Sequence, residues 1–293
     1  MSRLLLPALL LLGIGCARPV AKFTYTGESD PAPAEVRFDN ASKNAESYEW
    51  DFGDGATSTE PAPVHTYTES GNFLVQLKAT KGKKTVMSEE RIQINAPTRC
   101  LVEISTDQGK MVVWLYDQTP KHRDNFLKLA EEGFFDELLF HRVIEGFMIQ
   151  GGDPNSKGAA AGAPLGSGGP GYRIEAEITP ELIHKKGALS AARQGDQVNP
   201  QKESSGSQFY VVQGRPVDAG TLDQMEARKN IRYTPEQRAA YQEVGGTPFL
   251  DMEYTVFGEV VDGLDVVDKI AKAKTDGRDR PREDIQMRVR VIK

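Results

Sequence analysis

Several features are scarce or missing in this sequence. Its 293 residues carry a formal net charge of −6, and without a basic excess a nucleic acid is not expected as a partner. Only one uninterrupted apolar run is present, at the N-terminus, which excludes a membrane protein with several spans. The four histidines lack the spacing of metal ligands, so we expect no metal and no other cofactor. With 39% hydrophobic and 27% charged residues, the chain is globular, and its length favours two domains.

The first residues have the pattern of an export signal. Arg3 supplies the positive start, Leu4–Leu12 the apolar stretch, and residues 13–15 the small side chains that precede a cleavage point. An apolar stretch of about nine residues is too short to span a bilayer. We therefore interpret this segment as a signal peptide.

The residue that follows is a cysteine, and the run Leu12–Cys16 resembles the lipobox of bacterial lipoproteins. In this run Gly13 stands where leucine is usual. The resemblance implies a signal peptide at 1–15, acylation of Cys16, and a lipidated tether at 16–22. It also implies a protein anchored to a membrane of the bacterial cell envelope. An ordinary secretory peptide with an incidental cysteine is the alternative.

The second cysteine, Cys100, lies in an apolar, strand-like run. If Cys16 carries lipid, Cys100 is the remaining thiol, so an intramolecular disulfide cannot form. We interpret Cys100 as a small core residue and not as a nucleophile. Ala17, next to the acylated position, is compatible with sorting to the outer membrane.

Residues 23–95 show strand signals and no helical pattern. In residues 72–79 apolar and polar side chains alternate, which is the period of a half-buried strand. Further strands are predicted at 36–39, 47–52 and 85–94. Short strands at this spacing predict a small immunoglobulin-like β-sandwich.

The centre of this domain is Trp50–Gly55, with the sequence Trp-Asp-Phe-Gly-Asp-Gly, followed by Val64–Tyr67 and Gly71–Phe73. These segments resemble the PKD domain, and the resemblance covers nearly all of 23–95. Glycines permit the positive φ of a tight turn, the two aspartates can cap backbone amides, and Trp50 can fill the core. A calcium loop is disfavoured because the acidic residues miss the EF-hand spacing. Such a domain is a spacer or a binding module whose partner the sequence does not identify.

Residues 98–293 form a second domain with many strands and few helices. A hairpin is predicted from strands at 100–105 and 110–115, and Thr119-Pro120 is predicted to cap a helix with proline at its first position. A second helix is predicted at 263–273 and a final strand at 285–292. This composition predicts a closed antiparallel β-barrel capped by helices.

The segment Phe140–Asp153, which reads FHRVIEGFMIQGGD, looks like the signature of the cyclophilins. Further matches follow in the family's order at Gly166–Tyr172, Gly187–Ala192, Ser205–Val211 and Phe249–Glu259. The resemblance implies an eight-stranded barrel with two capping helices and peptidyl-prolyl cis-trans isomerase activity. Gly166, Gly168 and Gly171 also fit the dinucleotide fingerprint, but Pro170 interrupts the triplet, and a strand-like run follows it where a helix is required.

Isomerisation of an X-Pro bond is opposed by amide resonance, with a barrier of about 18–20 kcal/mol. A catalyst needs one fixed cationic donor for the twisted amide and an apolar pocket for the proline ring. The resemblance assigns Arg142 as the donor and Gln150 as the residue that orients it. It assigns the proline pocket to Phe147, Met148, Tyr210 and Leu250, the peptide groove to Ala192 and Gln208, and its rim to Phe249 and Tyr254.

Three positions depart from the family pattern. Arg193 stands where many members have an asparagine that contacts the peptide backbone, which makes it a possible substrate-binding residue. Phe249 replaces a tryptophan that helps cyclosporin binding, and Tyr254 stands where histidine is common. None of these departures touches Arg142. We interpret His141 as a structural histidine whose hydrogen bonds are satisfied.

About residues 214–248 the chain carries a polar insertion that the family core does not need. Thr221–Gln224 and Thr234–Gln237 both have capping-box patterns, which predict helices at 222–230 and 235–244. We hypothesise that this pair overhangs one end of the groove and restricts which chains enter. A solvated decoration without function is the alternative.

Together these patterns predict an envelope-tethered peptidyl-prolyl isomerase that assists the folding of exported, proline-containing polypeptides. The PKD-like domain would hold the barrel away from the membrane. The alternative is a lipid-anchored module or holdase that recognises proline and turns it over only incidentally. Arg142 and Gln150 favour the enzyme, because capture alone needs only the pocket.

Overall fold

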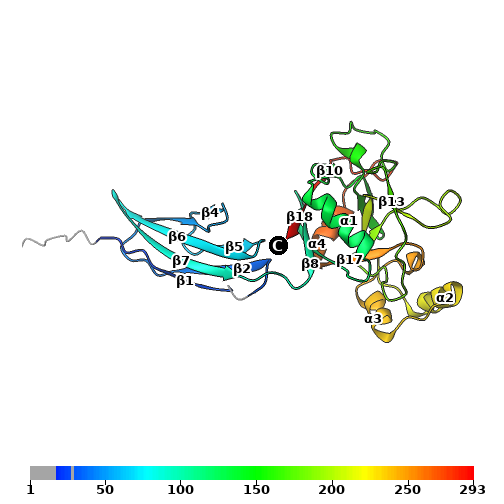
Figure 1. Ribbon diagram of the computed structural model, residues 1–293, viewed down its shortest axis with the longest axis horizontal. Helices are drawn as coiled ribbons and strands as arrows, with labels where there is room; N and C mark the ends of the chain where they lie inside the picture. Colours follow the sequence, from blue (N-terminus) through cyan, green and yellow to red (C-terminus); the bar gives the residue numbers. More distant parts are fainter. Residues whose placement is uncertain (1–17, 28–29) are drawn as a thin grey trace, which may run out of the picture. The chain divides into compact units, whose positions relative to one another are not determined.

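The computed structural model describes residues 18–27 and 30–293, and the predictions for residues 1–17 lie outside this part. The chain divides into a first unit that ends at Pro97 and a second unit, Thr98–Ile292. Both units are mainly β, as the sequence predicts (Figure 1).

The first unit consists of two antiparallel sheets. One contains β1 (Phe23–Thr26), β2 (Ala34–Asn40) and β5 (Val64–Tyr67), and the other contains β4 (Thr57–Ser58), β3 (Ser47–Asp51), β6 (Gly71–Lys81) and β7 (Lys84–Ile94). Along β2, buried Ala34, Val36 and Phe38 alternate with exposed side chains. One face of the strand is therefore buried and the other is solvated, which is the pattern of a β-sandwich.

Trp50 lies at the centre of the sandwich core with 1% of its surface exposed. Its ring packs between Phe23 and Phe38, with centroid distances of 5.2 and 5.5 Å. The indole Nε1 donates to the backbone oxygen of Glu60 at 2.9 Å. The tryptophan thus buries its large ring while its one polar atom is satisfied, as a buried indole requires.

The turn after β3 has the structural role that the sequence predicts for it. Asp51 Oδ1 accepts from the Gly53 amide at 2.9 Å, and Asp54 Oδ1 accepts from the Ala56 amide at 3.0 Å. Gly53 has a φ of +82°, and a Cβ there would lie 2.8 Å from the backbone oxygen of Leu74. Glycine is therefore required at this position by both conformation and space.

All the helices of the described residues lie in the second unit. In chain order its elements are β8 (Cys100–Thr106), β9 (Gly109–Leu115), α1 (Pro120–Glu131), β10 (Leu138–Leu139), β11 (Arg142–Ile144), β12 (Met148–Gly151), η1 (Pro154–Ser156), β13 (Arg173–Ile174), β14 (Ala188–Ala191), β15 (Ser204–Ser205), β16 (Phe209–Val212), α2 (Ala219–Lys229), α3 (Pro235–Glu243), η2 (Pro248–Leu250), β17 (Val256–Asp262), α4 (Leu264–Ala271) and β18 (Gln286–Ile292). Its main sheet has nine strands in the order β10-β18-β8-β9-β17-β14-β16-β12-β11.

The sequence leads us to expect a closed barrel of eight strands. The observed sheet has nine strands, and its two end strands do not pair with each other. Its two end strands, β10 and β11, follow each other in the chain with only Phe140 and His141 between them. β10 pairs with β18, whereas β11 pairs with β12. The two ends of the curled sheet are thus joined through the covalent chain, because one short strand is bent into two.

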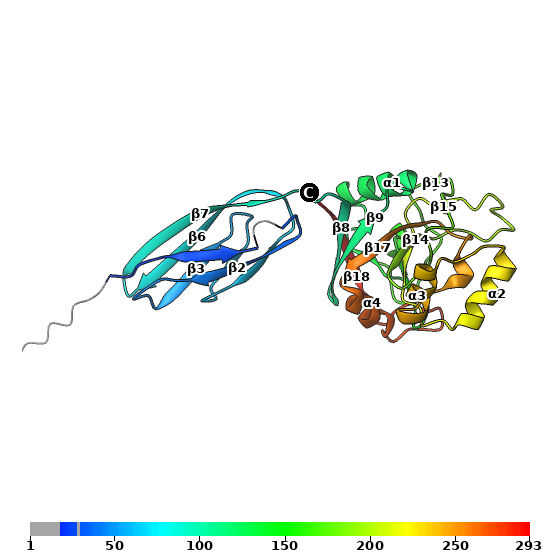
Figure 2. The ribbon, with the colours of Figure 1, turned by 90° about the horizontal axis from the view of Figure 1, so that it is seen from below.

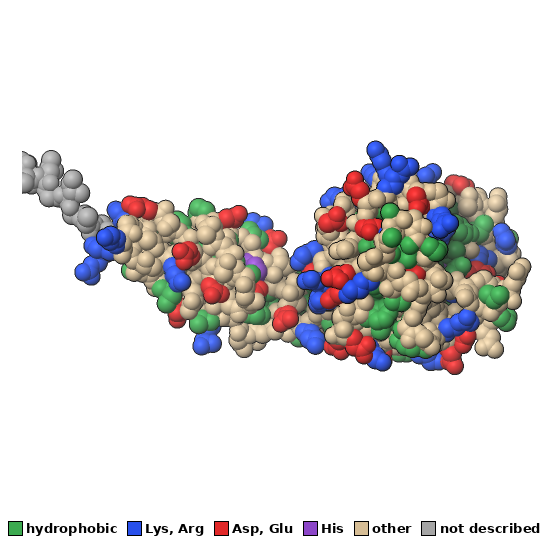
Figure 3. Space-filling view, turned by 90° about the horizontal axis from the view of Figure 1, so that it is seen from above, with side chains coloured by type: hydrophobic (Ala, Val, Ile, Leu, Met, Phe, Trp, Pro, Cys, Tyr) green, Lys and Arg blue, Asp and Glu red, His purple; other side chains and the backbone are tan. Residues whose placement is uncertain are grey.

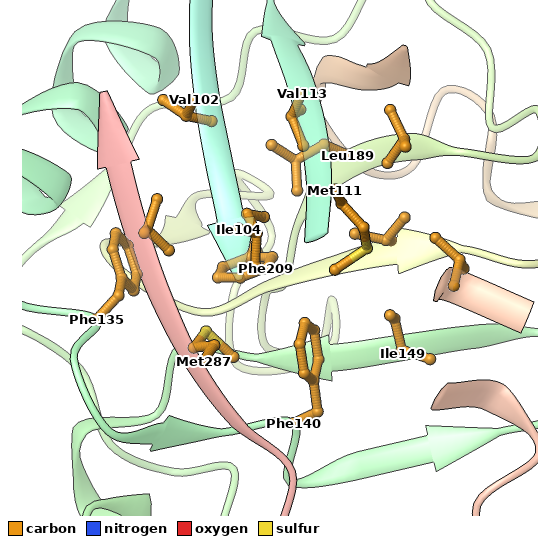
Figure 4. Packing of buried hydrophobic residues seen from close by; sticks show 14 of the residues in the cluster. Val102, Ile104, Met111, Val113, Phe135, Phe140, Ile149, Leu189, Phe209 and Met287 are labelled. Carbon is orange, nitrogen blue, oxygen red and sulfur yellow. The ribbon is translucent and has the colours of Figure 1, made fainter. Parts of the chain in front are cut away.

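The curled sheet encloses the main core. Ten of its buried side chains converge between the strands in Figure 4: Val102, Ile104, Met111, Val113, Phe135, Phe140, Ile149, Leu189, Phe209 and Met287. Helices α1 and α4 lie on opposite sides of the curled sheet (Figure 2). They add Phe126, Leu129, Val267 and Ile270 to the core. Pro120 occupies the first position of α1, as predicted, but the hydroxyl of Thr119 donates to Tyr116 O and does not cap the helix.

The insertion forms two helices that lie next to each other (Figures 1 and 2). The capping box predicted at Thr234 is present at the start of α3. The prediction at Thr221 is wrong, because α2 begins earlier and Asp218 is its N-cap. Asp218 accepts from the Thr221 amide at 3.0 Å and from its hydroxyl at 2.7 Å. Because the carboxylate of Asp218 caps the helix, α2 begins at Ala219, three residues before the predicted start at residue 222.

Within the described residues, none of the helices has the length and apolar character needed to cross a membrane.

Candidate functional site

The two residues predicted to be catalytic lie opposite each other on the β11–β12 hairpin. Arg142 pairs with Gln150 in the antiparallel register, and directly opposite residues project from the same face of a sheet. The hairpin turn is closed by the Phe147 amide, which donates to Ile144 O at 3.0 Å. The fold therefore places a cationic donor and an amide side by side on a rigid element.

A cavity of about 500 Å³ adjoins this hairpin. Its lining includes both Arg142 and Gln150, together with seven more of the residues predicted for the site: Phe147, Met148, Ala192, Arg193, Tyr210, Leu250 and Tyr254. Met148 and Tyr210 are buried in a small apolar cluster between β12, β14 and β16, separate from the main core. The site thus places the guanidinium of Arg142 beside an apolar wall, and further charged side chains, among them Arg193 and Asp276, line the same cavity.

Gln208 lines a second cavity of about 360 Å³, which shares Gln150, Ala192 and Arg193 with the first. The two amides are linked, because Gln150 Nε2 donates to Gln208 Oε1 at 3.2 Å. Gln208 Nε2 in turn donates to Gly168 O at 2.7 Å. The two cavities therefore adjoin each other through the residues that they share.

Phe249 is placed differently from the other residues predicted for the site. It is 51% exposed and lines a third cavity, together with Met225 of α2. Its ring packs on Phe147 with a centroid distance of 5.6 Å. Phe249 therefore supports the outer side of the pocket wall.

Arg142 has an acidic partner, Asp279, that was not predicted from the sequence. Arg142 Nε lies 3.4 Å from Asp279 Oδ2, and the Val143 amide donates to Asp279 O at 2.8 Å. The two side chains are about half exposed, so their ion pair is weak in energy. Hydrogen bonds of Gln150 to Arg142 are not found in the part of the chain that the structure describes. The carboxylate beside the guanidinium thus comes from a loop more than a hundred residues away, and no local sequence signal could have shown this.

The loop that carries Asp279 is itself well defined. Asp276 Oδ1 accepts from the amides of Arg278 and Arg280 at 2.8 and 3.0 Å, and these hydrogen bonds lower the pKa of the Asp276 carboxyl. The guanidinium of Arg280 donates to Ala160 O at 2.7 Å. The loop therefore forms a fixed wall of the first cavity.

Arg193, the possible substrate-binding residue, already has partners within the protein. Nε donates to Glu253 O at 2.7 Å, and Nη1 donates to Gln194 O at 2.9 Å. Its guanidinium also stacks over the ring of Tyr254 at 4.6 Å. With 4% of its side chain exposed, Arg193 holds the rim of the groove in place. Because these contacts occupy its guanidinium, they do not favour the predicted role of Arg193 in binding substrate.

His141 differs from the satisfied histidine that the sequence predicts. It is 4% exposed, and neither ring nitrogen makes a hydrogen bond with another described residue. Burial lowers the pKa of His141 below its ordinary 6.5. Burial likewise lowers the pKa of His122, although Glu177 acts in the opposite direction. Both histidines are therefore neutral in the folded protein at neutral pH.

This burial predicts a loss of stability in mild acid. A histidine whose pKa is lower in the folded state binds more protons when unfolded, so the free energy of unfolding falls as pH drops below about 6.5. Each of the two histidines contributes at most about 1.4 kcal/mol per pH unit. Urea unfolding at pH 7.5, 6 and 5 measures this slope, in a range above the titration of ordinary carboxylates. A free energy of unfolding that stays constant or rises between pH 7.5 and 5 would contradict the expectation.

One face of the larger unit carries charges of both signs. In Figure 3, hydrophobic side chains gather in patches between lysine, arginine and acidic side chains, without one sign taking over.

Comparison with known proteins assigns both units. The family described as cyclophilin type peptidyl-prolyl cis-trans isomerase/CLD matches residues 101–291, and the PKD domain family matches residues 16–96. A putative peptidyl-prolyl cis-trans isomerase of Staphylococcus epidermidis is 36% identical over 185 residues, which are 63% of this chain and 87% of that protein. A putative bifunctional phosphatase/peptidyl-prolyl cis-trans isomerase of Streptococcus pyogenes is 41% identical over 187 residues, but these make up only 37% of that protein.

A solved structure that resembles this chain is a cyclophilin type peptidyl-prolyl cis-trans isomerase of Cryptosporidium parvum. It is 26% identical with a TM-score of 0.48, and the match covers 66% of this chain and 97% of that one. The family match extends over nearly the whole second unit and includes every residue that lines the first cavity. The chain therefore belongs to the family of cyclophilin-type peptidyl-prolyl cis-trans isomerases, and its isomerase domain follows a PKD domain.

Proposed function

We propose that this protein accelerates cis-trans isomerisation of X-Pro bonds in exported polypeptides, with Arg142 as the residue that stabilises the twisted amide. The observation that carries the proposal is the position of Arg142, opposite Gln150 and at the edge of an apolar cavity of about 500 Å³. Arginine keeps its charge at every working pH. As resonance is lost, it can donate to the prolyl nitrogen or to the preceding carbonyl oxygen.

The reaction needs no covalent step and no cofactor. Met148, Tyr210 and Leu250 offer the proline ring an apolar surface, and burial of the ring fixes one side of the bond that must rotate. Gln150 and Gln208 offer amide groups along the second cavity for the rest of the peptide. Catalysis follows if the site binds the twisted amide more tightly than either planar form.

We also propose that the protein acts in the bacterial cell envelope, anchored through acylated Cys16. The support is the export pattern at residues 1–15 and the cysteine that follows it. Two or more acyl chains hold a protein stably at a membrane, whereas one does not. The PKD domain would then act as a spacer, and exported chains with prolines would be the clients.

Expression of the whole chain in a bacterium with a radiolabelled fatty acid tests the anchor. The unaltered protein is expected to carry label and to sediment with membranes, and Cys16→Ser to carry no label and to be released. A second variant, Cys100→Ser, is the matched control and should keep both the label and the membrane fraction. Equal labelling of the Cys16→Ser protein, or none in the unaltered one, would disprove the anchor and leave the isomerase assignment intact.

A further inference from the structure

Asp251 lies directly after η2 and is 3% exposed. Its Oδ1 accepts from the backbone amide of His184 and from His184 Nδ1, both at 2.8 Å. Its Oδ2 accepts from the hydroxyls of Tyr233 and Tyr241, both at 2.6 Å. A buried carboxylate is stable only when its oxygens are fully hydrogen-bonded. Four donors on two oxygens meet that requirement.

His184 connects this carboxylate to the proline pocket. Nδ1 faces an oxygen that only accepts, so Nδ1 carries the hydrogen, and in the neutral imidazole Nε2 is an acceptor. The hydroxyl of Tyr210 lies 3.0 Å from Nε2. Burial raises the pKa of Tyr210 well above its ordinary value, so this hydroxyl keeps its proton and donates it to the hydrogen bond. The His184 and Tyr210 rings also stack, with centroids 6.1 Å apart.

The other end of the chain of hydrogen bonds belongs to the insertion. Tyr233 lies between α2 and α3, and Tyr241 lies within α3. Both tyrosines belong to a small apolar core that joins the insertion to Ile183, next to His184. Lys229, at the end of α2, donates to Asp251 O at 2.7 Å. The insertion therefore contacts both the side chain and the backbone of Asp251.

The position of the insertion does not match the overhang hypothesised from the sequence. Among the described residues that line the first two cavities, none belongs to α2, α3 or the loop between them. The insertion instead packs against η2, which carries Leu250, and against Asp251, the residue that follows it. Met225 and Lys229 of α2 line the third cavity, together with Phe249 on the outer side of the pocket wall.

From this arrangement we infer that the insertion is a brace for the proline pocket, and that Tyr233 and Tyr241 are positioning residues for isomerisation. They act through Asp251 and His184, which fix the hydroxyl of Tyr210 and thereby hold its ring against the bound proline. This inference rests on the proposed function, because it concerns the pocket of the same site. It adds four residues to that site: His184, Tyr233, Tyr241 and Asp251.

A double-mutant cycle in the whole chain tests the brace. Tyr241→Phe removes one donor from Asp251 and is expected to lower kcat/KM for a proline peptide about tenfold, because small displacements in a site are costly. Tyr210→Phe removes the hydroxyl at the end of the chain. In that background the further effect of Tyr241→Phe should shrink to less than twofold, since coupled residues are not additive.

Two control variants separate positioning from loss of stability. Thr234→Ala removes the N-cap of α3 and destabilises the insertion without touching Asp251, and Tyr67→Phe removes a buried tyrosine hydrogen bond in the PKD domain. Both should retain kcat/KM within twofold. The ¹⁵N chemical shift of His184 Nε2 supplies a direct signature, and it should move in Tyr241→Phe and Tyr210→Phe but not in the two controls.

Three results would overturn the brace: full activity in Tyr241→Phe, equal losses in both backgrounds, or an unchanged His184 signal. The dissociation constant of the peptide is measured alongside the rates. If the unaltered protein binds the peptide without accelerating exchange, the proposed function fails. In that case the double-mutant cycle is repeated with the dissociation constant of the peptide as the measured quantity. Failure of the proposed function and failure of the brace are therefore distinguishable.

Discussion

Replacing Arg142 with alanine is expected to lower kcat/KM for X-Pro isomerisation by about 10²–10³-fold. Loss of one fixed donor to a developing charge has an effect of this size in other enzymes. The fold should survive, because the Arg142 side chain is 42% exposed and its pair with Asp279 lies at the surface. Exchange spectroscopy on an Ala-Pro peptide measures the rate, and circular dichroism checks the fold.

Two further variants define what Arg142 contributes. Arg142→Lys keeps the charge but loses the planar fork of donors, so we expect it to recover only part of the activity. Arg290→Ala, which removes an arginine that pairs with Asp136 outside the site, is the matched control and should keep the full rate. A folded Arg142→Ala protein with more than a third of the original kcat/KM would show that another group stabilises the twisted amide.

Replacing Asp251 with alanine is expected to lower the free energy of unfolding of the isomerase domain by about 3–5 kcal/mol, the usual effect of breaking a buried charged network. The substitution leaves His184, Tyr233 and Tyr241 without their shared acceptor. Each of these buried donors has given up its hydrogen bonds to water, and without Asp251 no hydrogen bond within the protein replaces them. The PKD domain, a separate compact unit, should unfold as before.

Urea unfolding, followed by tryptophan fluorescence and by proteolysis of the isomerase domain, measures this loss. Asp223→Ala is the control, because its pair with Arg238 has a carboxylate that is 67% exposed. That variant should stay within about 0.5 kcal/mol of the unaltered protein. A loss below about 1 kcal/mol in Asp251→Ala would mean that the network adds little to stability.

Local patterns in the sequence were sufficient for much of the fold. The alternation in residues 72–79 predicts the centre of β6, and the capping box at Thr234 predicts the start of α3. The turn after Trp50 follows from two glycines and two aspartates within six residues. Each of these features depends on neighbours in the chain, so a pattern within one segment contains the necessary information.

Contacts between distant segments could not be read in the same way. Asp279 reaches Arg142, and Asp251 reaches His184, across 137 and 67 residues of chain. Such partners are chosen by the folded sheet and not by local spacing. The same holds for Arg193, whose long side chain finds Glu253 where an asparagine would be too short. Sequence resemblance thus placed most of the pocket, whereas its supporting contacts needed the structure.

The measurement that tests the central claim most directly is the exchange between the cis and trans forms of an Ala-Pro peptide, recorded by NMR with catalytic amounts of the whole chain. Uncatalysed exchange takes tens of seconds or more. With the unaltered chain we expect exchange fast enough to give cross-peaks on the sub-second scale, and with Arg142→Ala a return to the slow rate. Peptide resonances that shift on binding while exchange stays slow would contradict the account and identify a proline-binding module.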